Sequence, residues 1–294
     1  MNRLSAQNRS MILTMLVEGM SMRSVSRTVG VSINTVTKLL IDAGEACAAY
    51  HESTVQNVKV KHVQCDEIWS FCYAKQRNVS TAKSAPAGAG DVWTWTAIDS
   101  DSKLIIAWEV GDRSPATAVE FTNNLRNRLA NRVQLTTDGY KVYLDAVRDA
   151  FGRDVDFGQL VKIFGKSDQT YPERQYSPSI CTGIKKRKII GSPDPNEIST
   201  SHVERQNLTM RMGMRRFTRL TNGFSKKLEN HLHMLSLYFV HYNFIRIHKS
   251  LKVSPAISVG LVDTLYGMDW LLKLIDEHIQ KRLDQASKLT ENSN

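Results

Sequence analysis

The hydrophobic pattern predicts helices at the start of the chain. Over residues 5–44, apolar positions recur at helical spacing, with a break at Gly30. This spacing predicts three short helices, over residues 9–18, over residues 22–28 and after a cap at Ser32. A short helix, a glycine turn and a second capped helix are typical of a helix-turn-helix. We therefore predict an all-α DNA-binding domain at residues 1–49.

In such a domain the third helix is the recognition helix. Polar residues in its first turns would be exposed and would reach base edges or phosphates. These residues are Ser32, Asn34, Thr35 and Lys38. An ordinary small helical bundle is the alternative interpretation of the same pattern.

The middle of the chain has the composition of strands. Runs rich in β-branched and aromatic residues predict strands over residues 58–73, 91–98, 104–110, 133–137 and 159–164. Helical spacing predicts helices over residues 114–131 and 141–151, and Ser114-Pro115 is a start signal for the first. The order β-β-β-α-β-α-β predicts an α/β fold with a mixed sheet that begins as an antiparallel meander. It matches the ribonuclease-H-like fold.

Composition shifts set the remaining boundaries. We expect a catalytic domain at residues 57–215, with a polar, basic insertion at residues 165–198 that shows no clear period. Residues 78–90 are small and polar, as in a mobile loop. Apolar residues at helical spacing predict a C-terminal helical extension at residues 216–286, followed by a disordered tail at residues 287–294.

Positive charge is concentrated late in the chain. The 294 residues carry a net charge of +10, and residues 185–227 contribute +8 of it. Because this stretch surrounds a candidate metal ligand, we favour contact with DNA phosphates over a solvated surface. The residues expected to touch DNA here are Lys185, Lys186, Arg187, Lys188, Arg205, Asn207, Arg211, Arg215, Arg216 and Arg219.

The four cysteines argue against a structural zinc site. None forms a Cys-x-x-Cys pair, so a structural zinc site is not expected, and we interpret them as buried small side chains in a reducing compartment. The start of the chain lacks a long apolar segment, and no apolar window has the length of a membrane span. We therefore expect a cytoplasmic, nucleoid-associated protein with no membrane partner.

Three acids have the arrangement that metal-dependent phosphoryl transfer requires. Asp66 lies in a β-rich run, where aspartate is disfavoured, and Asp138 ends the fourth predicted strand. These two strands are neighbours in the ribonuclease-H-like order. Glu204 lies on a helix after the fifth strand, which can pack against them. Hard oxygen ligands at these positions can hold two Mg²⁺ ions that clamp the attacking and leaving oxygens of a phosphodiester.

Each acid also has a structural interpretation. Asp66 can be a surface acid on an edge strand, with Glu67 as the competing ligand. Asp138 precedes a glycine, as in a common turn, and Asp99 is then the alternative second ligand. Glu204 fits a capping box with Ser201, and Glu197 is its substitute.

At these residues the chain resembles a DDE transposase, most closely of the IS-one family of bacterial insertion sequences. The resemblance covers roughly residues 60–260 and is carried by residues 66–71, 91–99, 135–139, 199–208 and 242–251. It implies that Asp66, Asp138 and Glu204 form a catalytic triad that uses Mg²⁺ or Mn²⁺, two ions per active site. It also implies cleavage and strand transfer on double-stranded DNA, at the element ends and the target.

Cutting of paired ends needs at least two subunits, so we expect a homodimer or larger oligomer on DNA. Members of the family often carry an N-terminal zinc-binding module, which this chain has no cysteine pair to build. Two other functions stay open. One is a non-mobile nuclease or recombinase on the same fold, and the other is a catalytically inactive DNA-binding repressor for which Mg²⁺ is irrelevant.

Overall fold

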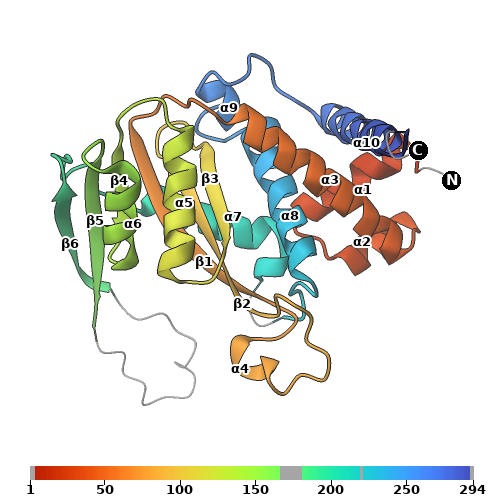
Figure 1. Cartoon of the computed structure of the whole chain (residues 1–294), viewed down its shortest axis with the longest axis horizontal. Helices are drawn as coiled ribbons and strands as arrows, with labels where there is room; N and C mark the ends of the chain where they lie inside the picture. The colour runs from red at the N-terminus through yellow and green to blue at the C-terminus, as the bar shows by residue number, and fades with distance from the viewer. Residues whose placement is uncertain (1–3, 166–180, 219–220, 292–294) are drawn as a thin grey trace.

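A six-stranded mixed sheet forms the centre of the molecule (Figure 1). The structure is a computed structural model that describes residues 4–165, 181–218 and 221–291. The sheet has the order β3-β2-β1-β4-β5-β6. Its strands are β1 His62–Cys72, β2 Gly90–Asp99, β3 Ile105–Gly111, β4 Gln134–Asp138, β5 Asp156–Phe164 and β6 Cys181–Ile190.

The strand directions identify the core. β1, β2 and β3 form an antiparallel meander, and β1, β4 and β5 run parallel. The first and fourth strands are therefore neighbours, as the ribonuclease-H-like order requires. This confirms the predicted mixed α/β fold. β6 adds to the far edge, antiparallel to β5.

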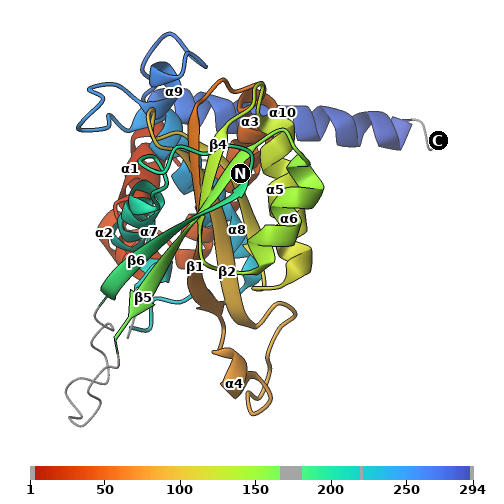
Figure 2. The same cartoon turned by 90° about the vertical axis from the view of Figure 1, so that its left-hand side faces the viewer.

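Helices cover both faces of the sheet (Figure 2). Helices α5, Pro115–Arg128, and α6, Val142–Phe151, lie on one face, and α7, Ser201–Gly213, lies on the other. The predicted start of α5 is confirmed, since Ser114 Oγ accepts a hydrogen bond from the backbone of Thr117. Because both faces are covered, β1 is buried at adjacent as well as alternate positions, and its buried residues include the polar Gln64, Glu67 and Ser70.

The three predicted N-terminal helices are confirmed. They are α1 Ala6–Val17, α2 Met22–Val29 and α3 Ile33–Thr54, with serine caps at Ser5, Ser21 and Ser32. Gly30 ends α2 at a φ of +72°, where glycine is favoured. Helix α3 has 22 residues and continues through the expected boundary at residue 49. Residues 45–56 can be a linker or a continuing helix by sequence, and the structure shows that the helix continues to Thr54.

The C-terminal helices pack against this long helix. α8 Leu228–Val240 ends in a π-helical turn, His241–Ile245, and is followed by α9 Pro255–Ser258 and α10 Met268–Glu291. A Cβ at Gly44 would lie 2.5 Å from the Cα of His233, so α3 and α8 touch backbone to backbone. α10 joins α1 through an Arg9–Asp276 ion pair at 2.5 Å. Within the described residues, no helix has the length and apolar character of a membrane span.

Several segments differ from the sequence predictions. Residues 181–190 of the expected irregular insertion form strand β6, while residues 166–180 lie outside the described residues. A short helix, α4 Gln76–Val79, begins the predicted loop. α10 stays helical beyond residue 287, up to Glu291. Three cysteines are buried as expected, but Cys181 is exposed on the edge strand β6.

Candidate active site

Asp66 and Asp138 are neighbours across two parallel strands. The last recorded pair between β1 and β4 is Cys65 with Thr137, so the two aspartates follow that pair at the next position of the same register. In-register residues of parallel strands point to the same face and lie about 4.8 Å apart along the backbone. Both carboxylates therefore project to one face of the sheet, Asp66 from the middle of β1 and Asp138 from the carboxyl end of β4.

Helix α7 lies over that face and is held there by β1 itself. The side chain of Gln64, two residues before Asp66, accepts hydrogen bonds from the backbone N–H groups of His202 and Val203, at 2.8 and 3.2 Å. Backbone N–H groups in the first turn of a helix have no acceptor within the helix, and here Gln64 supplies one. One turn later, Asn207 Nδ2 donates to Asp66 Oδ2 at 2.8 Å. The strand thus fixes both the start and the rotation of α7.

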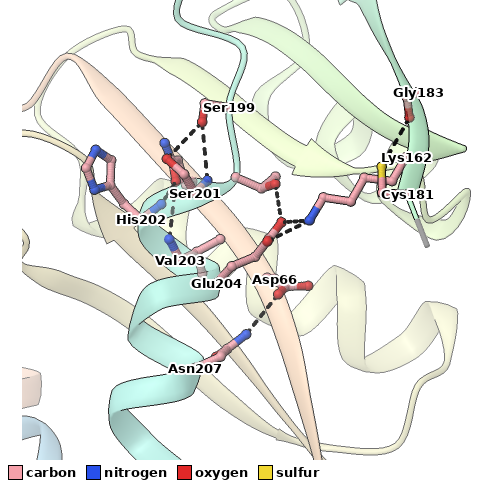
Figure 3. A network of polar contacts seen from close by, with 12 residues as sticks. Asp66, Lys162, Cys181, Gly183, Ser199, Ser201, His202, Val203, Glu204 and Asn207 are labelled. Carbon is pink, nitrogen blue, oxygen red and sulfur yellow. Dashed lines mark hydrogen bonds and ion pairs between the residues drawn. The ribbon is translucent and has the colours of Figure 1, made fainter. Parts of the chain in front are cut away.

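Glu204 projects from the first turn of α7 between these two contacts. Its Oε1 accepts a hydrogen bond from Thr200 Oγ1 at 2.6 Å, and Lys162 Nζ lies 2.5 and 2.6 Å from its two carboxylate oxygens. Figure 3 shows Lys162 reaching Glu204 from β5, with Asp66 beside Asn207. Ser201 is the first residue of the helix rather than its cap, so Glu204 does not close the capping box considered from sequence.

The pKa of Asp66 reflects its burial and the neighbouring acids. Burial, together with the charges of Asp138 and Glu204, raises the pKa of Asp66 to about 7, although hydrogen bonds from the Glu67 backbone and Asn207 act to lower it. A carboxylate that is both desolvated and surrounded by like charge disfavours its own ionised form. A bound cation would remove that repulsion.

Glu67 lies on the opposite face of β1. Its side chain is only 1% exposed and pairs with Arg113 at 3.2 Å. Burial raises the pKa of Glu67 to about 7, and Asp138 and Asp66 contribute to the rise. Arg113 in turn lies over the rings of Tyr140 and Trp93, at 4.1 and 4.8 Å. Glu67 is therefore part of a packed group of side chains and does not face Glu204.

The two other substitute ligands also lie apart from the cluster. Asp99 is 2% exposed, and its Oδ2 accepts hydrogen bonds from the backbone and hydroxyl of Ser102, at 2.7 and 2.5 Å. It thereby closes the turn between β2 and β3. Glu197 is exposed before α7. Neither is drawn toward Asp66.

The donor set fits a divalent cation in its chemistry, with one obstacle. Asp66, Asp138 and Glu204 supply hard oxygen ligands, and the charges of Asp138 and Glu204 add to the burial that raises the pKa of Asp66. As the side chains stand, no three metal-ligating groups in the described part of the chain converge to hold an ion. Glu204 is instead engaged by Lys162. For Glu204 to bind a metal ion, the Lys162 ammonium would have to leave its carboxylate.

The expected recognition residues differ in their surroundings. Ser32 and Asn34 are exposed, but Ser32 Oγ caps α3 by accepting from Thr35 N at 3.2 Å, and Lys38 pairs with Asp42 at 2.7 Å. A cavity of about 670 Å³ separates Asn34, Thr35 and Lys38 from α10. The start of α3 is accessible, with α10 along one side of it.

The basic residues occupy three places. Lys185, Lys186, Arg187 and Lys188 are exposed on the edge strand β6, where charge also protects an open edge from pairing with other strands. Arg205 is exposed on α7, Arg211 lies on its last turn, and Arg215 and Arg216 follow in the turn Arg215–Phe217. Arg219 lies outside the described residues. Asn207, expected to touch DNA, is 5% exposed and bound to Asp66.

Two residues of the site were missed from sequence. Gln64 and Lys162 lie on strands whose side chains point to the same face as Asp66. Gln64 is two residues from Asp66, so strand alternation would have assigned it to that face. Lys162 is distant in sequence, and only the pairing of β4 with β5 brings it near Glu204.

Comparison with known proteins gives distant structural matches. No protein-family model and no curated protein matches this chain. Among solved structures, it is similar to a piggyBac transposase synaptic complex with hairpin DNA, at 11% identity and a TM-score of 0.38, over 95% of this chain and 72% of that one.

Two further matches are complexes of the Mos1 transposase. The pre-cleavage transpososome is 12% identical with a TM-score of 0.21, over 53% of this chain and 60% of that one. The strand transfer complex is 13% identical with a TM-score of 0.23, over 81% and 78% of the two chains. At such TM-scores the likeness does not establish a common fold. The assignment of the core therefore rests on the strand order and directions described above.

Proposed function

We propose that this chain is a DDE-type DNA transposase that cuts DNA at the ends of an insertion sequence and joins them to target DNA. Asp66, Asp138 and Glu204 would hold two Mg²⁺ or Mn²⁺ ions. The observation that carries this proposal is the position of the three acids, which come from β1, β4 and α7 to one face of the sheet. The elevated pKa of Asp66 supports it, because such a carboxylate favours a cation.

The residues around the acids have distinct roles in this proposal. Asn207 donates to one oxygen of Asp66 and would orient this carboxylate toward a bound ion. Gln64 fixes the first turn of α7 and so sets how far Glu204 lies from the strands. Bound divalent ions would activate the attacking hydroxyl and stabilise the leaving oxygen. Lys162, once displaced from Glu204, would be a cation beside the scissile phosphate.

DNA is the proposed partner. The exposed cations of β6 and α7 would contact the phosphate backbone, and the start of α3 would reach base edges. As the sequence resemblance implies, we propose element ends of the IS-one type, a homodimer or larger assembly on DNA, and action at the nucleoid.

A cleavage assay tests the catalytic part of the proposal. A labelled DNA segment that carries the coding sequence with its native flanks is incubated with wild type and with Glu204→Gln, in Mg²⁺, in Mn²⁺ and in EDTA. We expect cuts at the two element ends with wild type and either metal, and none with Glu204→Gln or in EDTA. Equal cutting by both proteins would remove Glu204 from the site.

Strand transfer separates a transposase from a nuclease on the same fold. Adding a plasmid target should yield joined products with wild type. Cleavage without joining would favour the non-mobile nuclease. Binding of DNA without any metal-dependent cleavage would favour the repressor.

A further inference from the structure

A basic pocket lies where the N-terminal helices meet the segment after α7. Its volume is about 670 Å³, within the range of roughly 300–1,000 Å³ found for ligand sites. One wall is the start of α2 with the first turns of α3, and the other is formed by Arg215, Arg216, residues 222–224, Lys226 and α8. The lining includes four cationic residues, Arg23, Arg215, Arg216 and Lys226, and no acid among the described residues.

Arg216 is the unusual member of this lining. It is partly buried, its Nη1 donates to Ser225 Oγ at 2.8 Å, and its Nη2 lies 3.3 Å from the sulfur of Met22. Burial lowers the pKa of Arg216 to about 10, so its charge is costly as it stands. Neither of these partners carries a negative charge that would offset it.

The ionisable groups around Arg216 do not supply the missing charge. Burial raises the pKa of the Cys72 thiol to about 11, so it is neutral at pH 7. Burial and the charge of Arg216 lower the pKa of His231 to about 3 and also lower that of His233. The Cys72 thiol and the two imidazoles thus carry no negative charge at pH 7, and the charged residues of the pocket lining are all cations. The buried Arg216 therefore favours an anion from outside.

The other lining groups suit an oxyanion. Ser21, which caps α2, and Arg23 place the positive end of that helix dipole at the pocket. Asn222 and Asn230 add amide donors. Apolar side chains of Leu16, Ile33 and Met234 form part of the wall, and a wall of low polarity strengthens each charge interaction.

We propose that this pocket seats a backbone phosphate of the bound DNA. The position argues for DNA over a free anion, because the pocket opens beside the first turns of α3, where the proposed recognition residues lie. In helix-turn-helix proteins the helix before the recognition helix crosses the DNA backbone. Here that helix is α2, and Arg216, which follows α7 in the sequence, contacts it at Met22. The inference rests on the DNA-binding part of the proposed function.

Equilibrium binding to a random-sequence duplex in EDTA tests the pocket separately from cleavage. Arg23→Ala and Lys226→Ala remove exposed lining cations, and Arg27→Ala removes an exposed cation from α2 outside the pocket. Each lining variant should reduce the salt slope of log K by about one and weaken binding about eightfold at 0.1 M salt. Arg27→Ala should have a smaller effect on both.

Arg216→Gln should have the largest effect, with Arg216→Lys restoring part of it. If Arg216→Gln does not fold, the two exposed variants still decide the question. Lining variants that bind like wild type, or no worse than Arg27→Ala, would overturn the proposal. The proposal would also be overturned if sulfate raised the melting temperature of wild type more than that of Arg23→Ala while the two proteins bound DNA equally well. Because binding is measured in EDTA, its outcome does not depend on whether the protein cleaves DNA.

Discussion

Lys162 binds the carboxylate of Glu204 through both oxygens, at 2.5 and 2.6 Å. The pair links β5 to α7, two elements that lie far apart in the sequence. Because Glu204 is the proposed third ligand, the same carboxylate has two candidate partners, an ammonium and a divalent ion. The affinity of the site for metal should therefore depend on Lys162.

Replacing Lys162 by methionine should strengthen binding of Mn²⁺. The ion pair is partly exposed, with 34% and 40% of the two side chains accessible, so its loss should raise the affinity only about two- to fivefold. Calorimetric titration of Mn²⁺ into the DNA-free protein measures this. Lys185→Met, on the neighbouring strand and the other face, is the matched control and should bind like wild type. If Lys162→Met bound Mn²⁺ no better than wild type, Glu204 would not be a ligand.

Asn207→Ala should weaken the metal site without unfolding the protein. The amide orients Asp66, and loss of such an outer contact typically costs about 10–100-fold in metal affinity or activity. Mn²⁺ titration and thermal melting, run together, separate the two effects. Leu208→Ala, an exposed neighbour on α7, should change neither quantity. An Asn207→Ala protein with wild-type Mn²⁺ affinity would refute the orienting role.

The metal-free protein should lose stability as the pH rises. The folded-state pKa of Asp66 is about 7, above its unfolded value of about 3.9, so the folded chain holds this proton more tightly. Its unfolding free energy should fall between roughly pH 4 and pH 7, by a few kcal/mol at most. Glu67, with a pKa of about 7, acts in the same direction.

Chemical denaturation in EDTA at pH 5 and pH 8 measures this decline. Asp66→Asn should show a smaller decline, Asp145→Asn on exposed α6 should follow wild type, and added Mg²⁺ should reduce the decline in wild type. A wild-type protein that is more stable at pH 8 than at pH 5 in EDTA would contradict the prediction.

Gly44→Ala should destabilise the protein, although alanine is the better helix former. The new Cβ would lie 2.4 Å from the Cβ of His233, so α3 and α8 would have to separate. We expect a loss of about 1–3 kcal/mol in the free energy of unfolding. At exposed Ala49, on the same helix, Ala49→Gly should cost about 1 kcal/mol from propensity alone. A stabilised Gly44→Ala protein would mean that the two helices are not in close contact.

The sequence by itself determined most of the elements of this protein. Alternation and composition predicted the strands around Asp66 and Asp138. Helical spacing predicted α1, and serine caps helped to predict α2, α3 and α5. These signals are local, since side-chain periodicity and capping depend on residues only a few positions apart. The order of elements was enough to predict that β1 and β4 are neighbours, and with them the two aspartates.

Only the tertiary structure decided which side chains touch. Strand β6 has charged residues on both faces and no apolar alternation, so its place in the sheet depends on hydrogen bonding to β5. The Lys162–Glu204 pair and the pocket around Arg216 join segments separated by long stretches of chain. Sequence periodicity assigns a residue to a face of its own element, whereas contact between elements depends on strand register and on close approaches such as that at Gly44.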